Sequence, residues 1–455
     1  MSSASHRHPL AAIILCLLPG SPTVRAQVLY GNLVGGIADP SQAAIPSAAV
    51  KIVNTGTRQE WTATANDSGA FSLSTIPAGV YELTVSNPGF QTFTQQGLVV
   101  TANATVRVNV TLQVGAVSET VKVSASAAAL KTDSADVRAE IRAEEFQNLP
   151  VPFTRNYQNL LITVPGMTPP VNAHSVPANP SRSLQVNANG TNSQSANFRV
   201  DGATTGHPWL PHIAGYVPSL DAIESVTIVS NSFDAEQGYA GGAAVNVQIR
   251  SGTNDLHGSL YDHHFNQHLK ARPYFLPATQ DKEKRVVNQW GGTLGGPIVR
   301  NKLFYFAAFE GTFDRQGAFG ITSLPTARMH TGDFTESTRL IYDPLTGDLD
   351  GSNRVPFASN LLPAVRISPI AKKLNDLLPL PNYGPPGVAN NYFVSGPFAF
   401  DRRTLDSKLT WNAASRLILN ARISYLNWNC DDPAWLGQLG GGGIGRCSYD
   451  GKSFG

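Results

Sequence analysis

The sequence predicts a mainly β protein built from several parts. Short runs that alternate apolar and polar residues recur along most of the chain, and residues suited to turns separate them. The 455 residues include 41 glycines and 31 prolines, which favours short strands and many turns over helix bundles. This length is sufficient for two or three domains of ordinary size.

Composition excludes some classes of protein. Charged residues make up only 15% of the chain and the net charge is +2, so no strong field indicates a nucleic-acid partner. After the N-terminal segment, no run of 18 consecutive apolar residues occurs, and no membrane-spanning helix is predicted. A membrane role would therefore have to use strands.

Residues 1–26 are predicted to form a secretory signal peptide. Arg7 gives a basic start, residues 10–18 an apolar core, and residues 24–26 a small-residue cleavage pattern. Once this segment is removed, Cys430 and Cys447 remain in a compartment where disulfides persist. The sequence leaves open whether they are bonded to each other.

Residues 27–114 are predicted to form a β-sandwich with its own core. In "VYELTV" one face carries Tyr81, Leu83 and Val85, and the other face is more polar. Turn signals such as "NDSG", "PAG" and "NPG" separate the candidate strands "AAVKIVNTG", "QEWTATAND", "GAFSLSTI", "GVYELTVSNPGF" and "ATVRVNVTLQV".

The stretches "DSGAF" and "IPAGVYELTVSNPGF" resemble the carboxypeptidase regulatory-like domain, a transthyretin-like sandwich. The fold is often grouped with carbohydrate-binding-like sandwiches, but that grouping implies no sugar site here. Two interpretations remain for its aromatic residues, a ligand platform or core packing, and we favour packing for Trp61, Tyr81, Phe90 and Phe93.

Residues 115–130 are predicted to be a linker. Within it, "ETVKVSA" resembles the TonB box of TonB-dependent outer-membrane transporters. The resemblance implies that the periplasmic protein TonB is a partner and pairs with this peptide as an added strand. The alternative is that the segment is the last strand of the sandwich. The residues concerned are Glu119, Thr120, Val121, Lys122, Val123, Ser124 and Ala125.

Residues 131–254 are predicted to be a mixed α/β domain. A helix is expected where Val137, Ile141, Phe146 and Leu149 recur near helical spacing, and "NYQNLLITVPGM" is expected to form a second short helix or turn. Strands are expected in "SLQVNANG", "NFRVDGA" and "IESVTIVS". In order, the motifs "VDG", "IESVTIVSNSFDAEQGYAGGAAVNVQIRSGTN" and "HGSLY" resemble the plug domain of TonB-dependent receptors of the Oar-like type.

The segment "GGAAVNVQIRSGTNDLHGSLYDHHF" is interpreted as the joint between plug and barrel. A last plug strand would pass through "SGTN" into the first barrel strand. The glycine pair would let the plug backbone lie close to the barrel wall. The joint residues are Gly241, Gly242, Ser251, Gly252, Thr253 and Asn254.

No catalytic residue, metal site or cofactor is predicted, and the chain is not expected to be an enzyme. His263 and His264 are neighbours on a predicted strand and point to opposite faces, so they cannot chelate one ion together. His257 and His268 add no convergent carboxylates or thiols. Asp201 in "VDG" is interpreted as a turn residue before a glycine.

Residues 255–455 are predicted to begin a transmembrane β-barrel. In "TLDSKLTW", Leu405, Leu409 and Trp411 oppose Asp406, Lys408 and Thr410, which suits a lipid face and an inner face. A similar split occurs in "RLILNARISYLNW", although a soluble sheet would show the same alternation. Between these strands lies a long insertion with one short helix expected at residues 369–378, which the resemblance places outside the cell.

The resemblance implies a TonB-dependent receptor in the cell outer membrane, for energy-coupled uptake or sensing of an unidentified ligand, with carbohydrate and siderophore as candidates. Outer-membrane lipid would be the second partner. Alternatives are a secreted β-rich adhesin or carbohydrate-binding protein, and a non-functional fragment. Barrels of this type close about 22 strands, and only about 200 residues follow Asn254, so an incomplete barrel and a truncated chain are expected.

Overall fold

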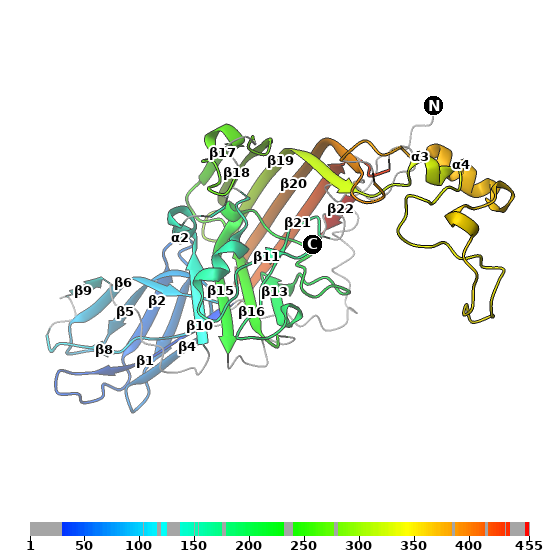
Figure 1. Cartoon of the computed structure of the whole chain (residues 1–455). Coiled ribbons are helices and arrows are strands. Elements are labelled where there is room, and N and C mark those ends of the chain that lie inside the picture. The colour runs from blue at the N-terminus through cyan, green and yellow to red at the C-terminus, as the bar shows by residue number, and fades with distance from the viewer. Residues whose placement is uncertain are drawn as a thin grey trace, which may run out of the picture.

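The computed structural model consists of a sandwich, a central domain and one long antiparallel sheet, in that order along the chain (Figure 1). The predicted mainly β fold is confirmed. Within the described part of the chain, no helix has the length and apolar character needed to cross a bilayer. The predicted signal peptide and Cys447 lie outside the described residues, which are 30–102, 104–115, 120–124, 137–149, 151–152, 154–174, 179–231, 240–276, 281–384, 387–414, 417–432, 434–436 and 451–454.

The N-terminal part is a sandwich of two sheets. In the first, β1 pairs with β4, β7 and β8, and in the second the strand order is β3-β2-β5-β6-β9. The bounds are β1 (Tyr30–Ala38), β2 (Ala49–Asn54), β3 (Glu60–Thr64), β4 (Ala70–Pro77), β5 (Gly79–Ser86), β6 (Thr92–Val100), β7 (Thr105–Arg107), β8 (Val110–Thr111) and β9 (Thr120–Ser124).

The sandwich core forms where the apolar faces of the two sheets meet. Tyr81 is fully buried, its hydroxyl donates to the Pro77 carbonyl at 2.6 Å, and burial raises the pKa of this phenol. The ring of Trp61 packs edge-on against Tyr81 with centroids 5.7 Å apart, and Phe90 and Phe93 pack against the same core. The four aromatic residues therefore serve packing, as we favoured from the sequence.

Two strands, β1 and β6, are absent from the predicted set because glycines interrupt their apolar patterns. In β1 the glycines allow close approach of backbones. A Cβ added to Gly35 would lie 1.8 Å from the carbonyl oxygen of Val108. This spacing explains why a glycine-rich run occupies the centre of a sheet.

The central domain is built on a five-stranded sheet of order β10-β15-β16-β13-β14. A hydrophobic core packs against it, including Tyr157, Phe198 and Val245. Its elements are β10 (Val137–Arg142), α2 (Ala143–Asn148), η2 (Tyr157–Thr163), β11 (Val171–Asn172), β12 (Leu184–Gln185), η3 (Ser193–Ser195), β13 (Ala196–Val200), β14 (Ala203–Thr204), η4 (Leu220–Ala222), β15 (Ile223–Asn231) and β16 (Ala243–Ile249).

One helix prediction in this domain was wrong in its first half. Residues 137–142 form strand β10, which pairs antiparallel with β15, and helix α2 begins only at Ala143. The apolar residues fit helical spacing, but Val137, Ala139 and Ile141 also alternate with period two. Pairing with β15 satisfies the backbone groups, and this tertiary contact decides the outcome.

The C-terminal part is an antiparallel meander that we call the wall sheet, of order β17-β18-β19-β20-β21-β22. Short turns join its strands at one end, at residues 299–303 and 414–417, whereas residues 267–284 and 323–391 connect them at the other end. The bounds are β17 (His257–Asn266), β18 (Arg285–Val299), β19 (Leu303–Thr322), β20 (Tyr392–Ala414), β21 (Leu417–Asp431) and β22 (Gly451–Phe454).

The two faces of the wall sheet differ as the alternation predicted. Asp406 and Lys408 are buried on the inner face, whereas Leu405, Leu409 and Trp411 are 38–49% exposed on the outer face. In β21, Ser424 is buried and Ile423 is exposed. The inner side is covered by the central domain, which lies in front of the wall sheet (Figure 1).

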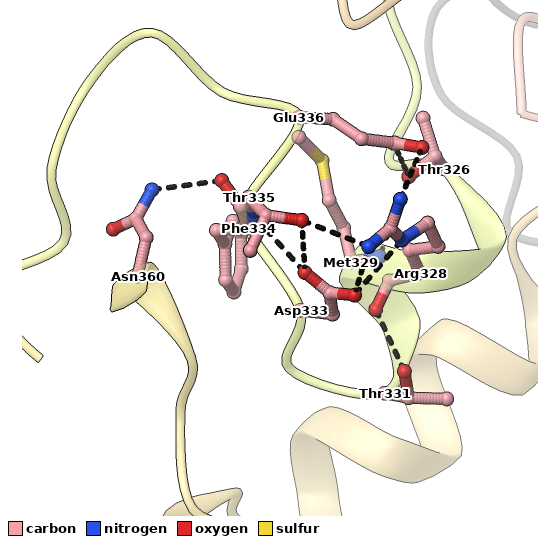
Figure 2. Close-up of polar contacts among 9 residues, drawn as sticks. All are labelled: Thr326, Arg328, Met329, Thr331, Asp333, Phe334, Thr335, Glu336 and Asn360. Atoms are coloured by element: carbon pink, nitrogen blue, oxygen red, sulfur yellow. Dashed lines mark hydrogen bonds and ion pairs between the residues drawn. The ribbon is translucent and has the colours of Figure 1, made fainter. Parts of the chain in front are cut away.

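The long insertion at the loop end is held together by local ion pairs. Arg328 lies 2.7 Å from Asp333 and 3.6 Å from Glu336, and the Thr335 hydroxyl donates to Asp333 at 2.6 Å (Figure 2). The hydrogen bonds from Thr335, together with Arg328, lower the pKa of Asp333 to about 2. The short elements here are α3 (Ala327–His330), η7 (Ala358–Asn360), η8 (Ala364–Arg366) and α4 (Pro369–Leu377), the last close to its predicted position.

Candidate functional site at the interface of the central domain and the wall sheet

The predicted joint connects three parts of the molecule. Its turn, Ser251–Asn254, lies between β16 and β17. The Asn254 amide exchanges two hydrogen bonds with Asn301 in the turn between β18 and β19, each at 2.8 Å. The backbone N–H of Asn254 also donates to the carbonyl of Gly56 in the sandwich at 3.0 Å. Sandwich, central domain and wall sheet therefore meet at this residue.

The glycine that approaches the wall sheet is Gly252. A Cβ added there would lie 2.2 Å from the Tyr305 carbonyl oxygen. Gly241 and Gly242 were expected to let the backbone lie close to the barrel wall. This was wrong, because both lie against the central domain itself. Their N–H groups donate to the Ser195 carbonyl, and a Cβ on Gly242 would meet the hydroxyl of Thr191 at 2.3 Å.

A buried charge cluster fastens the central domain to the wall sheet near the turn end. Asp201 lies 3.1 Å from the Lys408 ammonium and 3.4 Å from the Arg422 guanidinium. The Asp201 carboxylate also accepts from the Ile249 N–H at 3.1 Å, and Lys408 donates to the Ile249 carbonyl at 2.9 Å. Gly202 follows Asp201 in a turn, as predicted, but the ion pairs were missed.

Further polar contacts line the same interface. The Tyr216 hydroxyl donates to Asp406 at 2.8 Å, and the Ser424 hydroxyl donates to the same carboxylate at 2.6 Å. Burial and the neighbouring Asp406 raise the pKa of Tyr216 well above its usual value, so this phenol stays protonated as a donor. The buried Asp406 carboxylate thus has one donor from the central domain and one from the neighbouring strand β21.

Arginines dominate the interface towards the loop end. Arg402 donates to the Ser181 carbonyl at 2.9 Å and to Glu310 at 3.1 Å, and the Tyr261 hydroxyl donates to Glu310 at 3.1 Å. The alternation described for residues 404–411 and 416–428 does not include these three wall-sheet residues, so their positions on the inner face were not predicted. The partners in the central domain come from irregular loops, for which the sequence gives no periodic signal.

The TonB-box-like residues form part of a strand. Thr120–Ser124 are β9, which pairs in parallel with β6 at the edge of the second sandwich sheet, with Val121 opposite Phe93. Glu119 and Ala125 lie outside the described residues. The backbone pairing corresponds to the alternative that this segment is a sandwich strand, and its interaction with TonB stays a prediction.

The histidines do not converge on a metal site. His263 packs beside Tyr261 on β17, with ring centroids 5.5 Å apart, whereas His264 bonds Asn288 at 2.6 Å. Alternation along a strand puts them on opposite faces. Among the described residues there is no group of three His, Cys, Asp or Glu side chains that could hold an ion. Cys430 takes part in a disulfide.

Two family models match the chain. The carboxypeptidase regulatory-like domain matches residues 32–113, and the outer membrane beta barrel domain matches residues 248–453. The chain therefore combines the sandwich of the first family with the strands of the second. These matches and the fold make the chain similar to proteins of the TonB-dependent receptor class.

One similar protein is the TonB-dependent transporter Oar of Myxococcus xanthus. It is 25% identical over 314 residues, which cover 64% of this chain and 28% of the relative. The chain thus spans just over a quarter of the length of that transporter. Oar is a transporter, and the solved structures of PfeA and PirA, which also match, are receptors.

Two solved structures are also similar. The outer membrane transporter YddB from Escherichia coli is 12% identical, with a TM-score of 0.39, and the match covers 65% of this chain and 33% of that chain. The siderophore receptor PirA from Acinetobacter baumannii is 16% identical, with a TM-score of 0.31, over 70% of this chain and 43% of the other.

Proposed function

We propose that the chain supplies the regulatory-like, plug and first barrel regions of a TonB-dependent outer-membrane receptor, which takes up or senses a ligand. The observation that carries the proposal is the contrast between the two faces of the wall sheet. The outer face presents Leu405, Leu409 and Trp411, as lipid requires, and the inner face holds ion pairs to the central domain. In this proposal, residues 131–254 are the plug.

The placement of turns and loops supports an orientation. Barrels of the outer membrane have short periplasmic turns and longer extracellular loops. The short turns lie at the joint, where the sandwich also contacts Asn254, so this end would face the periplasm. The insertion with α3 and α4 lies at the opposite end of the wall sheet (Figure 1). Export by the signal peptide of residues 1–26 completes this proposal.

Residues Glu119–Ala125 would bind TonB by strand addition, and the ligand would be a carbohydrate or a siderophore. The test replaces Val121 with proline, which removes a backbone donor from the strand. Binding of the purified chain to the periplasmic domain of TonB is then measured by calorimetry. We expect at least a tenfold loss of affinity, since pairing depends on the main chain.

The matched control is Ala128→Pro, a proline in the same linker but outside the TonB-box-like residues. It should bind TonB as the unmodified chain does. Equal affinity of the Val121→Pro chain and the control would show that TonB, if it binds at all, uses another segment.

A further inference from the structure

A cavity of about 260 Å³ lies between the central domain and strands β18, β19 and β20. Three of its lining side chains are arginines, and the single acid is Asp314. Arg285 begins β18 directly after the loop of residues 267–284, so the cavity lies towards the loop end of the wall sheet. Its lining includes Asn156, Arg182, Arg285, Thr312, Asp314 and Arg402.

Among the described residues, arginines outnumber carboxylates in the lining of this cavity. Arg285 holds Asp314 with two hydrogen bonds, of 3.0 and 2.6 Å. Arg182 makes a longer contact with the same carboxylate, at 3.3 Å. Arg402 is bonded to Glu310. In these contacts between described residues, three guanidinium groups pair with two carboxylates, and the pairing of Arg182 is the longest, at 3.3 Å.

Arg182 is held in place with its backbone in an unfavourable conformation. Its φ is +54°, in the left-handed region that non-glycine residues seldom adopt. The Asn156 amide donates to the Arg182 carbonyl at 3.0 Å, and the guanidinium lies 4.3 Å from the centre of the Phe400 ring. Burial lowers the pKa of Arg182 to about 10; Asp314 opposes this shift, and Arg285 and Arg402 add to it.

Beside these arginines lie buried polar groups that have no hydrogen-bond partner among the described residues. Within the described residues, the buried Nε of Arg182 and the buried hydroxyl of Thr312 have no hydrogen-bond partner. Both residues line the cavity. Gln289, opposite Thr312 in the strand register, is buried with its side-chain amide unpaired. Unmade hydrogen bonds of buried groups are costly, and here they occur beside the arginines of the cavity.

We propose that this cavity binds an oxyanion group, a carboxylate or a phosphate, of a small ligand that enters from the loop end. Planar guanidinium forks suit such groups. Arg182 would give its unpaired Nε–H to the oxyanion, and the Thr312 hydroxyl would give a second bond. The inference goes beyond the proposed function, because anion binding here needs neither TonB nor transport.

A larger cavity, of about 690 Å³, opens between the central domain and β17. There Arg155 is paired with Asp221 at 2.5 Å, so the charge is balanced within the pair. We therefore place the proposed anion site in the smaller cavity.

The test titrates the purified, detergent-solubilised chain with succinate, with its neutral diamide succinamide, and with inorganic phosphate, all at constant ionic strength. Calorimetry gives the affinity, and the melting temperature reports stabilisation by the bound anion. We expect saturable binding of at least one anion and none of succinamide. A response to succinate identifies carboxylate as the group, and a response to phosphate identifies phosphate.

Three variants locate the site. Arg182→Gln should weaken anion binding about tenfold, and Thr312→Val should weaken it about fivefold. Thr312→Val should not lower the melting temperature of the free chain, since its hydroxyl has no partner to lose. Arg315→Gln is the matched control, because Arg315 lies on the same strand, pairs with Asp401 and does not line the cavity. It contacts the lining residues Asp314 and Phe400 through their backbone carbonyls. Absence of anion binding, or equal binding by Arg182→Gln, Thr312→Val and the control, would overturn the proposal.

Discussion

Removal of a charged side chain from the inner face of the wall sheet should lower the stability of the fold more than removal of one from the surface. Lys408 is 4% exposed and its ammonium serves both Asp201 and the Ile249 carbonyl. Removal of Lys408 would leave the buried Asp201 carboxylate with only the longer ion pair to Arg422, in a medium of low dielectric constant. The exposed pair of Lys51 and Glu60, at 2.7 Å, is solvated and loses little when broken.

Lys408→Ala should therefore lower the free energy of unfolding by about 3 kcal/mol. Lys51→Ala is the control and should change it by less than about 1 kcal/mol. Urea unfolding of the two variants, followed by tryptophan fluorescence, makes the comparison. Similar midpoints for both would mean that the Asp201 cluster does not stabilise the central domain against the wall sheet.

For these buried contacts, the sequence predicts the residue on the wall sheet but not its partner in the central domain. The alternation in "TLDSKLTW" placed Asp406 and Lys408 on the inner face, and their burial confirms it. The partners Asp201 and Tyr216 were not predicted as partners, because their positions depend on turns of the central domain. A carboxylate before a glycine has a sufficient local explanation as a turn residue, and nothing in the local pattern indicates a lysine two hundred residues later.

Among the elements, the joint turn packs its backbone closely against the wall sheet. Gly252 lies where a Cβ would meet two carbonyl oxygens, of Tyr305 at 2.2 Å and of Gly296 at 2.7 Å. Backbone atoms of a paired strand cannot move aside as a flexible side chain can. The turn must therefore shift if any side chain is added here.

Gly252→Ala should destabilise the chain by about 1–3 kcal/mol. The control is Gly317→Ala in β19, where an added Cβ would have no atom within 4 Å. Thermal unfolding of both variants is the measurement. If Gly252→Ala melts at the temperature of the control, the close approach of the joint to the wall sheet is not a constraint on folding.

Elements with a clear period were predicted well, and elements with a mixed period were not. The strand at residues 257–266 and the short helix at residues 369–377 match their predictions closely. Residues 137–142 fit two periods, and only the position of β15 selects the strand. In β1 the glycines that permit close backbone contact also remove the apolar signal by which a strand is recognised.

For the whole molecule, the sandwich is the part with the most self-contained core. All the buried residues of its core cluster lie between Leu33 and Leu112. Strand β9 is at the edge of its sheet and lies after this range. The hydroxyl of the buried Tyr81 donates its hydrogen bond to the Pro77 carbonyl, which lies in the same range.

Residues 27–114 should therefore fold without the rest of the chain. A purified fragment is expected to show a β-type circular dichroism spectrum and cooperative melting. A second fragment that extends to residue 125 should melt within a few degrees of the first, as only an edge strand is added. A disordered spectrum for both fragments would show that the sandwich needs the central domain to fold.

The parallel alignment of β9 with β6 also has a mechanical consequence. Residues 120–124 lie along residues 92–96. A force applied to β9 along its own axis loads all the backbone hydrogen bonds of the pair in shear, so they must yield together. A force applied across the strand opens the same bonds one after another, and a smaller force is sufficient. The direction in which a partner pulls on residues 120–124 thus sets whether β9 detaches or carries the sandwich with it.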